Sequence, residues 1–168
     1  MGGDSAGVAG YDLAVRADQK VFRNGAMLFG FTTSFRMGQL LRYALTVPER
    51  LPSVDVDRFM VTTFVDAVRE CLKSHGWAEK KHEQEIGGHF LVGYEGRLFK
   101  VESDYQVASA VDGFDACGCG DQIAKGCLFA SSHLAGKERA LLALQAAERF
   151  SAGVRGPFCV ESLDHETH

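Results

Sequence analysis

The pattern of hydrophobic and polar positions predicts strands and helices in an alternating order. Short apolar or alternating runs predict strands over Tyr11–Ala17, Lys20–Arg23, Ala26–Thr33, His89–Tyr94, Arg97–Glu102, Val107–Val111 and Phe158–Leu163. Apolar residues spaced by three and four predict helices over Phe35–Ala44, Val56–Ser74, Asp121–Ser132 and Lys137–Arg149. This order favours an α+β class, which two sheets packed face to face with helices outside would satisfy.

Punctuation between these elements supports the assignment. Asn24-Gly25 and Glu95-Gly96 are typical of hairpin turns. Ser34 is a predicted N-cap for the first helix, because its hydroxyl can accept a hydrogen bond from a free backbone N–H. The charged segment Ala78–Glu85 predicts an exposed loop, and Gly136 is expected to separate the last two helices.

Size and charge narrow the classes of function. The 168 residues suit one domain spanning 1–168. The net charge of −4 and the lack of a basic run exclude nucleic acid as an expected partner. No apolar stretch is long enough to span a membrane, and no export signal is evident, so we expect no membrane association and a cytoplasmic protein.

The cysteines and histidines give no sign of a metal site. Five cysteines without an export signal favour reduced thiols. Cys117 and Cys119 are two positions apart, which is not the spacing of a zinc knuckle. His89 and His133 are interpreted as ordinary strand-edge and helix-end residues. We therefore expect no metal and no cofactor.

Four short segments give the strongest indication of function. They are Gly3-Asp4-Ser5-Ala6, Lys20-Val21, Gly30-Phe31-Thr32-Thr33-Ser34, and Gly118-Cys119-Gly120 followed by Ala124 and Gly126. Their order and spacing resemble the proteasome β-subunit and the peptidase HslV, and in particular the proteasome-like proteins of bacteriophages and some bacteria. The resemblance runs over nearly the whole chain and implies a four-layer αββα sandwich, the fold of N-terminal-nucleophile hydrolases.

The resemblance also implies roles for particular residues. Asp4 matches the aspartate beside the nucleophile, and Lys20 matches the lysine that lowers the proton affinity of the nucleophile. Ser34 falls where a backbone N–H stabilises the oxyanion, at a position that is usually glycine in the family. Cys119 stands where the family has a serine. The implied activity is threonine-type peptide hydrolysis inside a homo-oligomeric ring, acting on peptides or unfolded proteins, with an ATPase as a possible partner.

The chain departs from the family at the catalytic residue. The nucleophile is expected well before Asp4, and only three residues precede Asp4 here. We therefore expect the first strand and the nucleophile to be missing from this polypeptide, and the polypeptide to be inactive as given. A late aspartate of the family aligns with Gly153.

Three interpretations stay open at this point. The first is a peptidase or amidase whose product begins upstream of Met1. The second is a non-catalytic relative that keeps the scaffold for binding or assembly. The third is a hydrolase that uses Cys119, although from residue type alone Cys119 is a buried or loop thiol. Likewise, Lys20 alone is a surface lysine, Asp4 a turn residue and Ser34 a helix cap.

Overall fold

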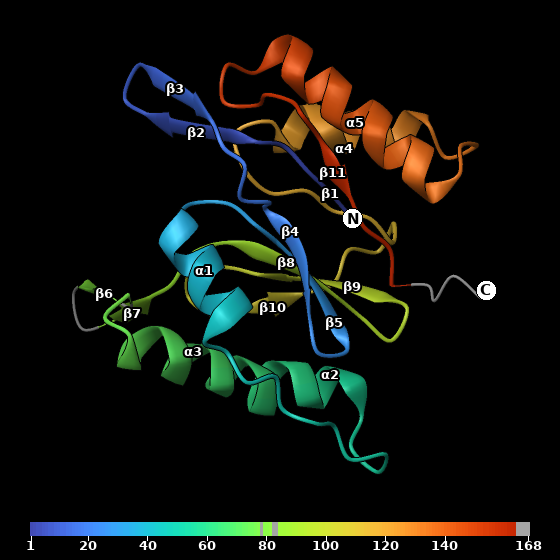
Figure 1. Ribbon diagram of the computed structural model, residues 1–168. Helices are drawn as coiled ribbons and strands as arrows, with labels where there is room; N and C mark the ends of the chain where they lie inside the picture. The colour runs from blue at the N-terminus through green and yellow to red at the C-terminus, as the bar shows by residue number, and fades with distance from the viewer. Residues whose placement is uncertain (78, 82–83, 164–168) are drawn as a thin grey trace.

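The computed structural model describes residues 1–77, 79–81 and 84–163 (Figure 1). Helices α1 to α3 cover one face of a five-stranded sheet. On the other side lie the strand pairs β1–β11 and β2–β3, and helices α4 and α5 lie beyond them. The arrangement is thus helix, sheet, sheet and helix, which confirms the predicted α+β class and the four-layer order.

The larger sheet is antiparallel throughout, in the order β10-β9-β8-β5-β4. Its strands are β4 Val21–Asn24, β5 Met27–Phe31, β8 Phe90–Tyr94, β9 Arg97–Val101 and β10 Val107–Ala108. The two predicted hairpins are present. Gly25 has φ +57°, and Glu95 and Gly96 have φ +47° and +73°. Two successive positive φ values match the right-handed twist of a hairpin, so the turn at residues 95–96 fixes the register of β8 and β9.

One face of this sheet forms the main core with the helices. The helices are α1 Phe35–Tyr43, α2 Val56–Phe59, the π-helical turn η1 Met60–Phe64 and α3 Val65–Ser74. The aromatic rings of Phe29, Phe64 and Phe90 are fully buried, with Phe29 6.1 Å from Phe64 and 6.2 Å from Phe90 between ring centroids. The predicted apolar stripe of residues 56–74 is therefore the core-facing side of the helix, while the π turn within it was not predicted.

The second sheet layer is built from small strands at distant points of the chain. Strand β1 Gly2–Gly3 pairs with β11 Cys159–Val160, and β2 Ala6–Ala9 pairs with β3 Asp12–Val15. Helix α5 Gly136–Phe150 packs over β1 and β11, and α4 Asp121–Ala130 packs against α5. A Cβ on Gly2 would lie 2.8 Å from the Leu144 side chain, so α5 approaches this layer closely.

Some predicted boundaries were wrong. Residues predicted as a loop form β6 Glu79–Lys81 and β7 Gln84–Ile86, with 78 and 82–83 outside the described residues. Gly136 is the first residue of α5, so this helix begins one position earlier than predicted. Of Val107–Val111 and Phe158–Leu163 only two residues each form strands: β10 pairs with the last two residues of β9, and β11 pairs with β1, which is itself two residues long. In the described part of the chain, no helix has both the length and the apolar character needed to cross a bilayer.

Candidate functional site

Asp4 and Lys20 form an ion pair between the two sheet layers. Lys20 directly precedes β4, and Asp4 follows β1. The Lys20 ammonium lies 2.8 Å from Asp4 Oδ1, and the two side chains are only 14% and 13% exposed. Asp4 Oδ2 also accepts hydrogen bonds from the backbone N–H groups of Ala6 (2.8 Å) and Arg155 (3.2 Å). The structure therefore brings together the two groups whose spacing suggested a common site, and it fixes the carboxylate on both oxygens.

An aromatic ring beside Lys20 holds a second cation. The Arg16 guanidinium lies 3.9 Å from the Phe35 ring centroid, and the Lys20 ammonium lies 5.7 Å from it. Arg16 also makes two hydrogen bonds of 2.7 Å to Asp18, and the hydrogen bond from Arg16 lowers the pKa of the Asp18 carboxyl. Sequence reasoning missed Arg16 and Phe35, because a face-on contact between a strand-end arginine and a helix-start phenylalanine has no signature in spacing.

Ser34 caps α1 as predicted. Its hydroxyl accepts a hydrogen bond of 3.1 Å from the Arg36 N–H. Its own backbone N–H donates to the Thr32 carbonyl oxygen at 2.9 Å, across Thr33, which has φ +73°. The N–H that we expected to face an oxyanion is therefore engaged within a tight turn. A ligand oxygen would have to replace Thr32 as its acceptor.

Cys119 lies in the loop before α4 and is exposed. A Cβ on Gly153 would lie 2.8 Å from its sulfur, so the absence of a side chain at position 153 makes room for this thiol. The preceding Gly118 has φ +107° and approaches Thr32. The neighbouring thiol of Cys117 is different, because burial raises its pKa to about 12.

A cavity of about 840 Å³ connects these positions. Asp4, Lys20, Ser34 and Cys119 all line it. Its remaining walls are mostly apolar and come from the sheet face opposite the main core and from α5, including Leu28, Leu91, Leu98, Ala140 and Leu144. A concave, largely apolar cavity with a few convergent polar groups is typical of a ligand site.

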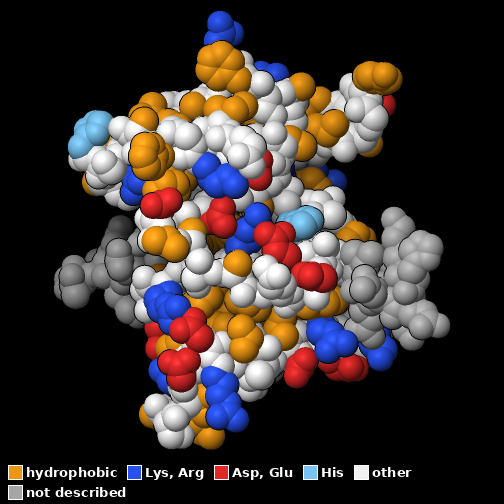
Figure 2. Space-filling model, turned by 180° about the vertical axis from the view of Figure 1, so that it is seen from behind, with side chains coloured by type: hydrophobic (Ala, Val, Ile, Leu, Met, Phe, Trp, Pro, Cys, Tyr) orange, Lys and Arg blue, Asp and Glu red, His pale blue; other side chains and the backbone are white. Residues whose placement is uncertain are grey.

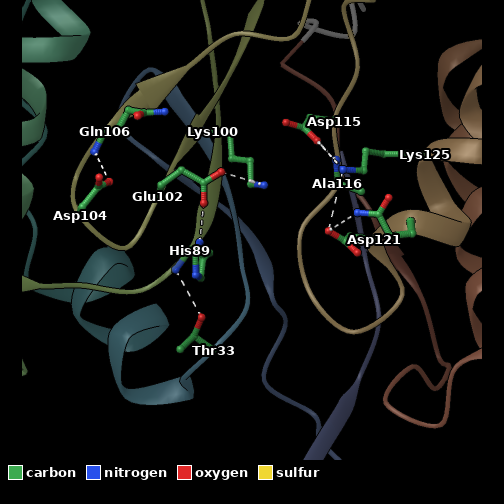
Figure 3. A network of polar contacts seen from close by, with 11 residues as sticks. Thr33, His89, Lys100, Glu102, Asp104, Gln106, Asp115, Ala116, Asp121 and Lys125 are labelled. Atoms are coloured by element: carbon green, nitrogen blue, oxygen red, sulfur yellow. Dashed lines mark hydrogen bonds and ion pairs between the residues drawn. The ribbon is translucent and has the colours of Figure 1, made fainter.

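A polar network lies beside this cavity (Figure 3). His89 Nδ1 lies 2.7 Å from Glu102 Oε2, and the Lys100 ammonium lies 2.9 Å from Glu102 Oε1. The hydrogen bond from Lys100, with a smaller contribution from His89, lowers the pKa of Glu102, and the same bond raises the pKa of Lys100. Seen from the back of the molecule, basic, acidic and histidine side chains gather midway along its length (Figure 2).

Sequence reasoning treated His89 as an ordinary strand-edge residue and did not consider Glu102. A signal was available, because the turn at Glu95-Gly96 pairs Tyr94 with Arg97. Counting back along both strands places position 89 opposite position 102.

No group of three or more histidine, cysteine or acidic side chains in the described ranges could hold a metal ion. The acidic residues nearest the cavity have cationic partners instead. Asp115 and Asp121 both lie near Lys125, at 4.0 and 3.9 Å (Figure 3).

Comparison with known proteins gives a consistent result for the fold. No family model matches the sequence, and no curated protein is detectably similar to it in sequence. Among solved structures, Thiobacillus denitrificans BPH in complex with epoxomicin matches with a TM-score of 0.76 and 20% identity, over 94% of this chain and 88% of that chain. Eukaryotic HslV from Trypanosoma brucei matches with a TM-score of 0.66 and 18% identity, over 95% and 90% of the two chains.

A third structure, the Anbu (Gly-1) mutant from Hyphomicrobium sp. strain MC1, has a TM-score of 0.62 and 18% identity. It is matched over 94% of this chain and 73% of that chain. The chain therefore has the fold of the HslV- and proteasome-like N-terminal-nucleophile hydrolases, as the sequence motifs predicted.

Proposed function

We propose that this chain is a peptidase of the HslV- and proteasome-like kind, which hydrolyses peptide bonds with a nucleophile placed beside Asp4 and Lys20. The observation that carries the proposal is the Lys20–Asp4 pair, 2.8 Å apart and largely buried on the wall of the cavity. A buried ammonium next to a reacting hydroxyl favours its deprotonated form, because opposite charges attract more strongly where water is excluded.

The proposed chemistry is acyl transfer. A hydroxyl attacks the scissile carbonyl carbon, its proton passes to a base, and a tetrahedral intermediate with a negative oxygen forms. The departing amine takes the proton, and water then hydrolyses the acyl intermediate. Lys20 favours the attacking alkoxide, Asp4 holds Lys20, and the Ser34 N–H is the proposed donor to the oxyanion. The apolar cavity would hold the peptide or unfolded segment.

The proposal requires a nucleophile beside Asp4 and Lys20. Met1, the first residue of the 168-residue sequence, lines the cavity, and its ammonium donates to the Glu161 carbonyl oxygen at 2.7 Å. Its thioether is not a nucleophile for acyl transfer. We therefore expect the 168-residue polypeptide that begins at Met1 to be inactive in peptide hydrolysis. Cys119 is the weaker candidate nucleophile, because its thiol shows no hydrogen bond to a base among the described residues.

A non-catalytic scaffold is the second candidate function. The hydrogen bond from the Ser34 N–H to Thr32 favours it, since the proposed oxyanion donor is occupied. In that case the cavity would bind an extended segment without cleaving it.

Assembly into a homo-oligomeric ring is part of the proposal, with an ATPase as a possible partner and the cytoplasm as the expected location. Solved structures of HslV and BPH share the fold, which supports the ring. Large apolar side chains are exposed on α4 and α5, namely Phe129 (72%), Phe150 (76%), Leu141 (38%) and Leu142 (39%). The helix Val56–Ser74 and the hairpin at Glu95 are further candidate contact surfaces.

The decisive experiment begins with the native protein. Its intact mass identifies the first residue. Fluorogenic peptides then test hydrolysis by the native form and by the 168-residue polypeptide that begins at Met1. Epoxomicin, the compound in the BPH complex, serves as a second probe through a stoichiometric gain in mass.

In the native form, Lys20→Ala is expected to lower kcat by about 100-fold or more, a loss typical of an electrostatic stabiliser. Lys137→Ala is the matched control, because Lys137 is exposed on α5. Rapid turnover by Lys20→Ala, or by the 168-residue polypeptide that begins at Met1, would overturn the proposed roles. A native first residue without a hydroxyl or thiol would support the scaffold instead.

A further inference from the structure

Several strand ends meet at the end of the large sheet where Lys20 lies. Strand β5 pairs with β8 through Phe31 and Phe90, and β8 pairs with β9 through Phe90 and Val101. Extending each ladder by one residue places Thr32, His89 and Glu102 in one row across the sheet. This row borders the cavity through Thr32.

Within this row, the backbone of His89 makes two hydrogen bonds to residues just beyond the end of β5. The His89 carbonyl oxygen accepts a hydrogen bond of 3.2 Å from the Thr32 N–H. The His89 N–H donates to Thr33 Oγ1 at 3.3 Å. The His89 ring is bonded to Glu102, which Lys100 holds from the other side (Figure 3). Thr33 is therefore the last member of a chain of contacts that begins at Lys100.

Thr33 has a backbone conformation that β-branched residues rarely adopt, with φ +73°. Such a conformation persists only where its surroundings impose it. Two contacts do so here: the Thr33 hydroxyl bonded to His89, and the Ser34 N–H bonded to the Thr32 carbonyl at 2.9 Å. The direction of the Ser34 N–H thus depends on where Thr33 is held.

We propose that Thr33 is a positioning residue, whose hydroxyl, anchored by His89 and Glu102, sets the direction of the Ser34 N–H at the cavity wall. This inference rests on the proposed function, in which Ser34 donates to an oxyanion. Thr33 touches no reacting atom in this scheme, and it acts only through the turn. An oxyanion would take the place of the Thr32 carbonyl oxygen as acceptor, so the turn has to present the Ser34 N–H in one fixed direction there. Losing the hydroxyl contact frees the turn, so the Ser34 N–H samples more directions and stabilises an oxyanion less well.

The test uses two substitutions of similar size at one position. Thr33→Val keeps the β-branch and removes the oxygen that accepts the His89 N–H. Thr33→Ser keeps that oxygen. Thr63→Val, on the exposed side of the helix at residues 56–74, is the control for replacing a surface threonine by valine.

The first readout is the rate of hydrogen exchange at the Ser34 amide, measured by NMR on the 168-residue polypeptide that begins at Met1. We expect exchange about 10-fold faster in Thr33→Val and close to wild type in Thr33→Ser, because exchange follows local opening of the hydrogen bond. Unchanged exchange in Thr33→Val would overturn the inference.

The second readout is peptide hydrolysis by the native form. We expect Thr33→Val to lower kcat by about 10-fold with little change in KM, and Thr33→Ser to restore most of the loss, since the contact matters only in the transition state. A rise in KM at constant kcat would also overturn the inference. Faster Ser34 exchange without hydrolysis in any form would refute the peptidase function while leaving Thr33 as the residue that holds the turn.

Discussion

The Asp4–Lys20 pair is expected to contribute to stability as a coupled unit. The perturbation is a double-mutant cycle of Asp4→Asn, Lys20→Met and the double variant, with the free energy of unfolding measured in urea. Coulomb's law at the observed 2.8 Å gives about 1.5 kcal/mol of attraction in bulk water and about 6 kcal/mol at an effective dielectric constant of 20. Side chains only 14% and 13% exposed place the pair between these limits.

Desolvation of both charges offsets much of this attraction. We therefore expect a coupling energy of about 2 kcal/mol, and a cost of about 2–3 kcal/mol for each single variant, because each leaves a charge without its partner. For a chain of this size, a loss of that order lowers the melting temperature by roughly 4–12 °C.

The chain offers a matched control in Arg16 and Asp18. This pair has a similar separation of 2.7 Å, but its side chains are 38% and 40% exposed. Exposed pairs contribute little, so its coupling should be clearly smaller than that of Asp4–Lys20. A coupling for Asp4–Lys20 no larger than that of Arg16–Asp18 would refute the reasoning that burial makes the site pair strong.

Two further predictions concern glycines and thiols. Gly38→Ala is expected to destabilise the protein by about 1–2 kcal/mol, because the new Cβ would overlap the Phe31 ring. Gly126→Ala places its Cβ in open space on a helix and should stabilise the protein by up to about 1 kcal/mol. Chemical unfolding of both variants checks that the two changes in stability have opposite signs. With iodoacetamide at pH 8, Cys119 should be alkylated and Cys117 should not, because a pKa of about 12 keeps the Cys117 thiol protonated until the pH approaches that value. Peptide mapping shows which thiol reacted, and labelling of Cys117 at pH 8 would contradict its burial.

The half of the fold around the main core could be predicted from local pattern. The helix at residues 56–74 has buried Phe59, Met60, Phe64 and Val68 at intervals of one, four and four, so its apolar stripe identified it. The turn at Glu95-Gly96 likewise set the β8–β9 register. In both cases the signal and the structure it specifies lie within a few residues of each other.

The second sheet layer could not be predicted in the same way. Strand β1 contains only glycine, and its partner β11 lies more than 150 residues away in the sequence. Glycine has neither β-propensity nor an apolar face, and pairing over such a separation depends on the packing of α5 against both strands. Only the order of motifs, taken from the family resemblance, indicated that Asp4 and Lys20 lie together.

The two faces of the large sheet explain why the candidate site lies where it does. On β5, Met27, Phe29 and Phe31 belong to the main core, while the intervening Leu28 and Gly30 face the cavity. The core face therefore fixes the strands in place, and on the cavity face Gly30 has no side chain, which leaves room beside the sheet for the Met1 side chain. The polar residues of the site lie at or just beyond the strand ends, namely Lys20, Thr32, His89 and Glu102. Their side chains lie outside the core, while their backbone is held by the adjoining strands. Charged groups placed there are held in position without the cost of burial in the aromatic core, which is the arrangement that a site with fixed electrostatics requires.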